Sequence, residues 1–303
     1  TDGPMRWAYE KVDFDPGGKD PSSEGSSYDT AKQIVQAVWG RSPPIYQPYD
    51  FVMMKGGTGK MSSSRGEMLT VSTALKIYSP VMVRWIFANQ RPNTDFSIAF
   101  DEDVIKLHDE FDRFEEYALG PKPDKKPENW TTARRTYQLS TIDDKLPAAA
   151  PYRAPFRDLT TRLQICDGDI DRTMQKFYKA EIKTSEDKTA FILRAKCAMN
   201  WLDEFAPDSF RYKIHTTPVQ MSLNNDQKVA LEKLRSLVEK VDLETIDPKD
   251  LNQSIYDEAI RGSGCDSKIF FQMVYNKLIG RDQGPRLPAF MKELGKERLL
   301  KLL

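Results

Sequence analysis

Residues 56–64 read Gly-Gly-Thr-Gly-Lys-Met-Ser-Ser-Ser, so that Lys60 and three hydroxyl groups follow directly after a cluster of glycines. Glycines let backbone N–H groups come close to phosphate oxygens, because no Cβ stands in the way. The lysine adds a compact positive charge, and the serine hydroxyls can donate further hydrogen bonds. The stretch has the chemistry of a triphosphate-binding loop, although many glycine- and serine-rich stretches are plain surface loops.

The same stretch does not fit the P-loop pattern, Gly-x-x-x-x-Gly-Lys-Ser/Thr. If Gly59 and Lys60 formed its Gly-Lys pair, the first glycine would fall at position 54, which is Met54. The residue after the lysine would be serine or threonine, but it is Met61. The P-loop interpretation therefore fails on both sides of the lysine.

Helical and strand signals alternate around this loop. The predicted elements are a helix over 30–39, strands over 45–46 and 49–54, and a buried helix over 81–88. Asp29 is predicted to be the N-cap of the first helix, and Gly40 is predicted to end it. The first hundred residues therefore indicate a partial α/β domain.

From residue 101 onward, apolar residues recur at helical spacing almost throughout. A proline-rich turn at 120–127 and a break at 206–218 interrupt the pattern. In the last block, helices are predicted over 229–238, 251–260, 269–278 and 294–303. The fold class predicted for the chain is thus α/β plus all-α, with domains at 1–100, 101–220 and 221–303.

Further segments, taken with the serine loop in this order and spacing, resemble the class I lysyl-tRNA synthetases, whose loop reads Lys-Met-Ser-x-Ser. These segments are Met5-Arg6-Trp7, Gly17-Gly18-Lys19-Asp20, Tyr49-Asp50-Phe51-Val52, Ser79-Pro80-x-x-x-Arg84-Trp85, Arg91-Pro92-Asn93 and Leu278-Ile279-Gly280-Arg281-Asp282-Gln283-Gly284-Pro285-Arg286. The resemblance runs through the whole chain. It implies the C-terminal part of a Rossmann-type catalytic domain with its stem-contact region, then a helix bundle, then an anticodon-binding domain.

The sequence departs from the family pattern in two respects. The His-Ile-Gly-His-type ATP motif is absent, since the only histidines are His108 and His215. We therefore expect the chain to begin inside the catalytic domain and to be inactive alone. The usual Lys-Asp-His reads Lys19-Asp20-Pro21, and Ser26 stands at a usual glycine position. Pro21 puts the conformation of the substrate pocket in doubt.

The resemblance implies a lysine–tRNA ligase that uses ATP with Mg²⁺. The lysine carboxylate would attack the α-phosphate of ATP and release pyrophosphate, after which the lysyl group would pass to the 3′ end of tRNA(Lys). The catalytic residues implied are Lys60, Ser62 and Ser64, and the ATP-binding residues are Gly57, Gly59, Lys60, Met61 and Ser63. Positioning and charge stabilisation would drive the reaction.

Positions that match the family are candidates for binding the two other substrates. For lysine, whose ammonium groups need carboxylates or aromatic faces, they are Trp7, Asp20, Tyr28 and Tyr49. For tRNA they are Arg134, Arg135, Arg281 and Arg286. Each also has an ordinary structural interpretation, as a core aromatic ring or a salt-bridged surface group. Phe270, Phe271 and Tyr275 could stack on anticodon bases, but their spacing favours the core.

Composition sets outer limits on function. Lys+Arg and Asp+Glu both count 45, which excludes a simple polybasic nucleic-acid binder but allows local basic faces. The three cysteines, Cys166, Cys197 and Cys265, are scattered, so we expect no structural metal and a reducing cytoplasm. No apolar run reaches the roughly 18 residues of a membrane span. We expect a monomer.

Two other functions remain open at this point. One is a tRNA-binding module without catalysis, which the missing ATP motif and Pro21 favour. The other is a ligase similar to glutamyl-tRNA synthetases, which share the helical anticodon-binding architecture. The serine loop and the segments around Arg6-Trp7 and Lys19-Asp20 favour lysine over glutamate, by resemblance alone.

Overall fold

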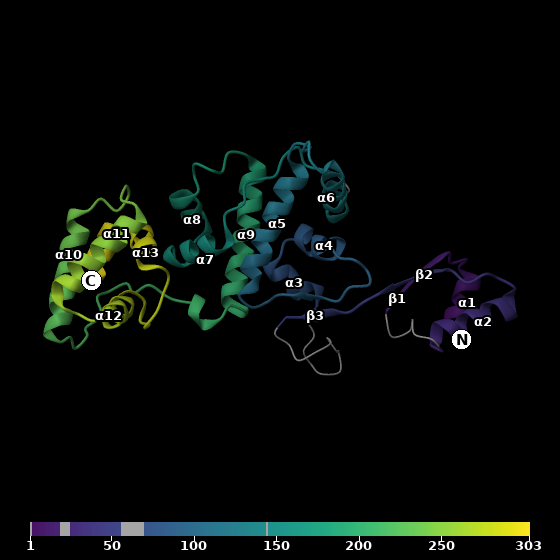
Figure 1. The fold of residues 1–303 in the computed structure, drawn as a ribbon, viewed down its shortest axis with the longest axis horizontal. Helices are drawn as coiled ribbons and strands as arrows, with labels where there is room; N and C mark the ends of the chain where they lie inside the picture. The colour runs from purple at the N-terminus through teal and green to yellow at the C-terminus, as the bar shows by residue number, and fades with distance from the viewer. Residues whose placement is uncertain (1, 19–24, 56–69, 144) are drawn as a thin grey trace. The chain divides into compact units, whose positions relative to one another are not determined.

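The computed structural model of the chain describes residues 2–18, 25–55, 70–143 and 145–303 (Figure 1). They form two compact units, Thr1–Ala150 and Pro151–Leu303. Helices dominate both units, and the strands of the described residues form two-stranded parallel sheets in the first unit. The expected combination of a small α/β part and a helical remainder is confirmed. The division into three functional domains stays a prediction.

The first unit opens with a β–α–β segment built from β1 (Phe14–Gly18), α2 (Ser27–Trp39) and β2 (Ile45–Tyr49), with α1 (Asp2–Tyr9) before it. Parallel strands need a crossover connection between them, and α2 lies between these two strands in the sequence. Helix α1 packs against α2, and Trp7, Ala31 and Val35 are buried together. Gly40 ends helix α2 as predicted, and its backbone is left-handed there.

The second sheet pairs β3 (Val52–Met54) in parallel with β4 (Phe96–Ile98). Between them in the sequence lie α3 (Val71–Ile77) and α4 (Pro80–Ala88). Ser79 caps α4 by accepting the Met82 N–H at 3.3 Å, and Pro80 suits the first helical position because no partner for its nitrogen is needed there. Four residues of α4 are buried, which confirms the predicted buried helix.

Helices α5 (Asp103–Leu119) and α6 (Pro127–Ser140) complete the first unit. Helix α6 packs against both α4 and α5. The Tyr137 hydroxyl donates to the buried Glu115 carboxylate at 2.6 Å, so this interior carboxyl group is hydrogen-bonded. The predicted proline-rich turn is the connection between α5 and α6.

The second unit begins with α7 (Phe156–Ile165), α8 (Ile170–Phe177) and α9 (Ser185–Glu204). Helix α7 packs against α9, and the fully buried rings of Phe156 and Trp201 meet edge-on at 5.8 Å. Burial of a ring as large as that of Trp201 typically contributes about 3–5 kcal/mol relative to alanine. This contact is therefore a main source of stability for the pair.

The first turn of α9 is held by a capping box. The Thr184 side chain accepts the Asp187 N–H at 3.0 Å, and the Asp187 carboxylate accepts the Thr184 N–H at 2.9 Å. The same carboxylate also accepts the N–H groups of Tyr152, at 2.7 Å, and Lys183, at 3.1 Å. Asp187 thus ties the segment before α7 to the start of α9.

A helical block on one apolar core forms the rest of the second unit. Its elements are α10 (Asn225–Lys240), α11 (Pro248–Ser254), the π-helix η4 (Ile255–Ile260), η5 (Arg261–Ser263), α12 (Ser267–Ile279), α13 (Leu287–Leu294) and α14 (Lys296–Leu302). The short helix η3 (Asp208–Phe210) lies between α9 and this block in the sequence, and its Phe210 ring meets that of Trp201 edge-on. The chain passes from α11 into η4 without a break. Phe270 and Tyr275 are buried in this core and Phe271 packs against it, as their spacing predicted.

The start of α2 differs from the prediction. Ser26 is the N-cap residue, and Asp29 lies in the first turn of the helix. The Asp29 carboxylate accepts the Gly25 N–H at 3.0 Å and pairs with Lys32 at 2.6 Å. The hydrogen bond from Lys32, followed by that from Gly25, lowers the pKa of Asp29.

Two other predicted elements are divided in the structure. Residues 49–54 are not one strand, since Tyr49 ends β2 and β3 begins at Val52. The helix predicted over 294–303 is broken at Gly295, which has a φ of 85°. Glycine adopts this conformation readily and other residues rarely do, so the chain turns there and starts a new helix.

Candidate functional site

The serine loop lies outside the described residues, and so do all of the predicted catalytic and ATP-binding positions together with Asp20. The chain on both sides of the loop is described. Before it, the Lys55 N–H donates to the Ile98 carbonyl at 3.1 Å, and the Lys55 ammonium pairs with Asp103. After it, the Thr70 side chain caps α3 by accepting the Thr73 N–H at 3.1 Å. Hydrogen bonds therefore fix the points where the chain enters and leaves the loop.

A cavity of about 460 Å³ lies in the first unit, lined by residues of α1, α2, β1 and β2. Trp7, Tyr28 and Tyr46 contribute three aromatic rings to its lining, and Asp15 contributes a carboxylate. The rings of Tyr28 and Tyr46 stack with centroids 4.0 Å apart, and Trp7 meets Tyr28 edge-on at 5.6 Å. Aromatic faces beside a carboxylate suit a ligand that carries an ammonium group.

Hydrogen bonds orient the polar ends of this lining. The Trp7 indole donates to an Asp15 carboxylate oxygen at 2.9 Å. The Tyr28 hydroxyl donates to the Pro44 carbonyl, and the Tyr46 hydroxyl to the Gly18 carbonyl, both at 3.3 Å. Burial raises the pKa of Tyr28, with Lys32 acting in the opposite direction. The Tyr28 phenol therefore stays protonated and remains a hydrogen-bond donor at neutral pH.

The β1–β2 register brings two of these groups together. Asp15 lies directly opposite Tyr46 in the parallel pair. A Cβ atom at Gly17 would overlap the Tyr46 hydroxyl. Glycine at position 17 therefore leaves the space that the Tyr46 ring occupies.

Tyr28 already contacts one ammonium group of the protein itself. The Lys32 ammonium lies 4.9 Å from the centroid of the Tyr28 ring, and it pairs with Asp29 on the same helix. The environment of this ring thus accommodates a positive charge next to an aromatic face.

Comparisons with known proteins point to one family. A family model described as tRNA synthetases class I (K) matches residues 1–143. A lysine–tRNA ligase of Borrelia garinii subsp. bavariensis is 37% identical over the whole chain, which spans 57% of that relative. Lysine–tRNA ligases of Thermococcus kodakarensis and Treponema pallidum are also 37% identical over the whole chain, which spans 57% and 56% of them.

The chain is a homologue of the class I lysyl-tRNA synthetases. It spans somewhat more than half the length of the relatives it matches. The similarity covers the whole chain, so both compact units of this synthetase homologue have counterparts in those proteins.

The structure brings together only some of the residues predicted to bind lysine. Trp7 and Tyr28 line the same cavity of the synthetase homologue, whereas Tyr49 is half exposed at the end of β2 and is not part of the lining. Sequence reasoning missed Asp15 and Tyr46. The parallel pairing of β1 with β2 would have indicated both residues. That pairing could not be predicted, because β1 is rich in proline and glycine and does not look like a strand in the sequence.

The arginines predicted to bind tRNA have different surroundings. Arg134 donates to the Ala118 carbonyl at 3.3 Å, and its guanidinium lies 5.3 Å from the Trp130 ring. Arg135 is exposed and donates to the Gln138 side chain at 2.8 Å. Arg281 donates to the Asp208 carbonyl, and Arg286 is exposed just before α13. Contact with tRNA stays a prediction for all four positions.

Two general findings complete the description of the synthetase homologue. Within the described ranges, no group of three or more His, Cys, Asp or Glu side chains is arranged to hold a metal ion. Among the helices in these ranges, none is both long and apolar enough to cross a membrane.

Proposed function

We propose that this chain supplies the amino-acid pocket, the serine loop and the tRNA-binding helices of a cytoplasmic lysine–tRNA ligase. The observation that carries the proposal is the cavity of Trp7, Tyr28, Tyr46 and Asp15, in a chain homologous over its whole length to lysine–tRNA ligases. The substrates would be lysine, ATP and tRNA(Lys). Mg²⁺ would arrive on the ATP phosphates, as is usual for this ion.

Lysine would bind with an ammonium group against the cavity rings, and Asp15 would balance its charge. Its carboxylate would attack the α-phosphate of ATP, so that a bond to phosphorus forms while the bond to the β-phosphate oxygen breaks. The pyrophosphate would leave with that electron pair. Lys60 would stabilise its developing charge, with Ser62 and Ser64 donating hydrogen bonds.

The helical residues from 101 onward would hold the tRNA. Residues 101–220 would form the helix-bundle domain, and residues 221–303 would recognise the anticodon. Among the predicted positions, Arg281 and Arg286 are the stronger candidates, because both lie in the irregular segment between α12 and α13. Such a segment can follow the shape of an RNA loop more easily than a regular helix can.

Lysine-dependent exchange between ATP and pyrophosphate tests this proposal. The chain would be joined to the part of the Borreliella burgdorferi relative that it does not match, since it spans 56% of that protein. We expect exchange with lysine and none with glutamate. Exchange with glutamate would support the alternative similar to glutamyl-tRNA synthetases, and tRNA binding without exchange would support a non-catalytic module.

Replacing Gly17 with alanine is expected to weaken lysine binding by the isolated chain about fivefold. The new Cβ would displace the Tyr46 ring and break its stack on Tyr28. Such aromatic pairs contribute about 0.5–1.5 kcal/mol beyond their buried area. Isothermal titration with lysine measures the effect.

The matched control is Gly3→Ala, which adds the same methyl group elsewhere on the lining of this cavity. A Cβ at Gly3 would meet no other atom within 4 Å. Lysine affinity should therefore stay close to that of the unchanged chain. Equal affinities of the Gly17 and Gly3 variants for lysine would argue against Tyr46 as part of the lysine site.

A further inference from the structure

Three cations of the second unit line a cavity of about 860 Å³. Arg211 and Lys213 belong to the irregular segment between η3 and α10, and Arg281 follows α12. The turn between α7 and α8 and the C-terminal end of α9 supply the other walls. The cations come from segments far apart in the sequence, and the tertiary structure brings them to one cavity. They are therefore not simply neighbouring charges on the solvated face of one helix.

Arg211 has an unsatisfied donor at this site. Its Nε atom is buried and has no hydrogen-bond partner within the described part of the chain. A buried donor without a partner typically costs about 1–3 kcal/mol. The Nε itself is too buried for a ligand to reach, but the same guanidinium carries terminal N–H donors, and a guanidinium binds phosphate and carboxylate oxygens well.

Arg281 is held in place while retaining donors for a ligand. Its guanidinium donates to the Asp208 carbonyl. An arginine carries five N–H donors, and this contact needs only one of them. Lys213 is exposed, so its ammonium can reach a ligand at the mouth of the cavity.

The carboxylates at this cavity do not cancel the positive charge. Asp167 and Asp203 are the acidic residues of the lining. The Asp167 carboxylate faces the Arg298 guanidinium at 3.9 Å, so a fourth cation offsets it. Three cations then remain against Asp203, and the site favours an anion.

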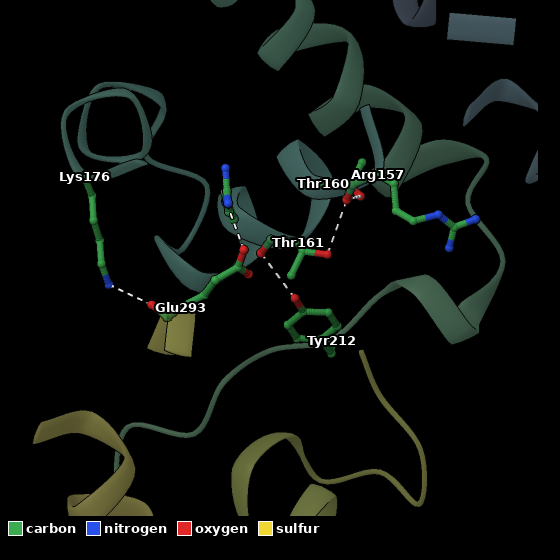
Figure 2. A network of polar contacts seen from close by, with 7 residues as sticks. Arg157, Thr160, Thr161, Lys176, Tyr212 and Glu293 are labelled. Carbon is green, nitrogen blue, oxygen red and sulfur yellow. Dashed lines mark hydrogen bonds and ion pairs between the residues drawn. The ribbon is translucent and has the colours of Figure 1, made fainter. Parts of the chain in front are cut away.

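Apolar side chains and an aromatic ring also belong to the lining, beside the polar Gln164 and Thr216. Met199, Leu202, Ile279 and the Tyr212 ring take part in it. The Tyr212 hydroxyl donates to the Thr161 carbonyl of α7 at 3.2 Å (Figure 2), and burial raises the pKa of this tyrosine. The Glu293 carboxylate of α13 pairs with Arg162 of α7 at 2.9 Å, and the Lys176 ammonium of α8 donates to the Glu293 carbonyl at 3.0 Å. These contacts join α13 to α7 and α8.

We propose that this cavity binds the phosphodiester backbone of an RNA strand, with Arg211, Lys213 and Arg281 as phosphate-binding residues. The inference rests on the proposed function, in which tRNA is the RNA that the chain binds. A lone phosphate ion would need only the cations. The apolar side chains and the Tyr212 ring add a surface for the ribose and base of the same nucleotide.

Titration of the full chain with a tRNA(Lys) transcript at several salt concentrations tests the site. Arg211→Gln, Lys213→Gln and Arg281→Gln should each weaken binding by about three- to tenfold. Each should also lower the slope of log affinity against log salt by about one, because one phosphate contact is lost. Lys188→Gln is the matched control, since Lys188 is exposed on α9 about 22 Å along the helix from Asp203. It should leave affinity and slope unchanged.

One further variant is expected to strengthen tRNA binding, a result that misfolding would not produce. Asp203→Asn removes the remaining negative charge from the lining and should tighten tRNA binding about two- to fivefold at low salt. If the unchanged chain binds tRNA and all four variants behave like Lys188→Gln, the cavity is not the phosphate site, while the proposed tRNA-binding function stands. If the unchanged chain binds no tRNA, that function fails, and the inference fails with it.

Discussion

Lys60→Ala is expected to slow lysyl-adenylate formation by about 10²–10³-fold in the chain joined to the part of the Borreliella burgdorferi relative that it does not match. The lysine charge would act on pyrophosphate as it leaves, an interaction stronger in the transition state than in the ground state. The loss should therefore fall on the rate constant for adenylate formation, with lysine affinity nearly unchanged. Single-turnover adenylation with rapid quenching measures it.

The control for this experiment removes another lysine ammonium from the same unit. Lys106 is exposed on α5, where its ammonium lies 3.9 Å from the Glu110 carboxylate one turn away. Such surface pairs contribute little to stability. Lys106→Ala should therefore keep the adenylation rate. A Lys60 variant with weaker lysine binding and normal turnover would contradict the role proposed for Lys60.

Asp187→Ala is expected to lower the free energy of opening of α9 by about 2–4 kcal/mol. The carboxylate accepts the backbone N–H groups of Tyr152, Lys183 and Thr184, and alanine leaves all three without this acceptor. Hydrogen exchange of the α9 amides in the full chain measures the change locally. Glu186→Ala is the matched control, because Glu186 is exposed in the same first turn. It should lower that free energy far less than Asp187→Ala does, because this carboxylate is exposed to solvent.

The contribution of Asp187 to stability also depends on pH. The hydrogen bond from Tyr152 is the largest cause that lowers the pKa of Asp187, from 3.8 to about 2. A carboxyl group with a lowered pKa in the folded state stabilises it fully above the ordinary value. This stabilisation is lost as the pH falls from about 4 towards 2. The stability difference between the unchanged chain and Asp187→Asn should shrink over that range, and a constant difference would contradict the assignment.

Local signals in the sequence predicted part of the fold well. Helix α2 ends at Gly40 as expected, and α4 begins at Pro80 and buries one face. Strand β1 gave no such signal, because its sequence Phe-Asp-Pro-Gly-Gly has low strand propensity. Pairing with β2 makes it a strand. The break at Gly295 was missed because the apolar spacing continues across it.

The candidate site was also predicted only in part from the sequence. Trp7 and Tyr28 were found by resemblance, and packing of α1 on α2 brings them to one cavity. Asp15 and Tyr46 were missed because only the strand register places them opposite each other. Burial of Phe270 and Tyr275 followed from helical spacing. The unsatisfied Nε of Arg211 depends on contacts distant in sequence, which no local pattern contains.

The π-helix η4 has a consequence for how this block can change in evolution. Its wider turn holds one residue more than an α-helical turn would, inside a helical run from Pro248 to Ser263. Deletion of one residue there would let the run continue as an α-helix. A deletion elsewhere in the run would rotate all later residues by about 100° around the helix axis relative to the core. Leu251 before the π-helix and Ile255 and Ala259 within it are fully buried, so such a rotation would move core residues into solvent. Single-residue deletions in this run are therefore expected to be tolerated best within Ile255–Ile260.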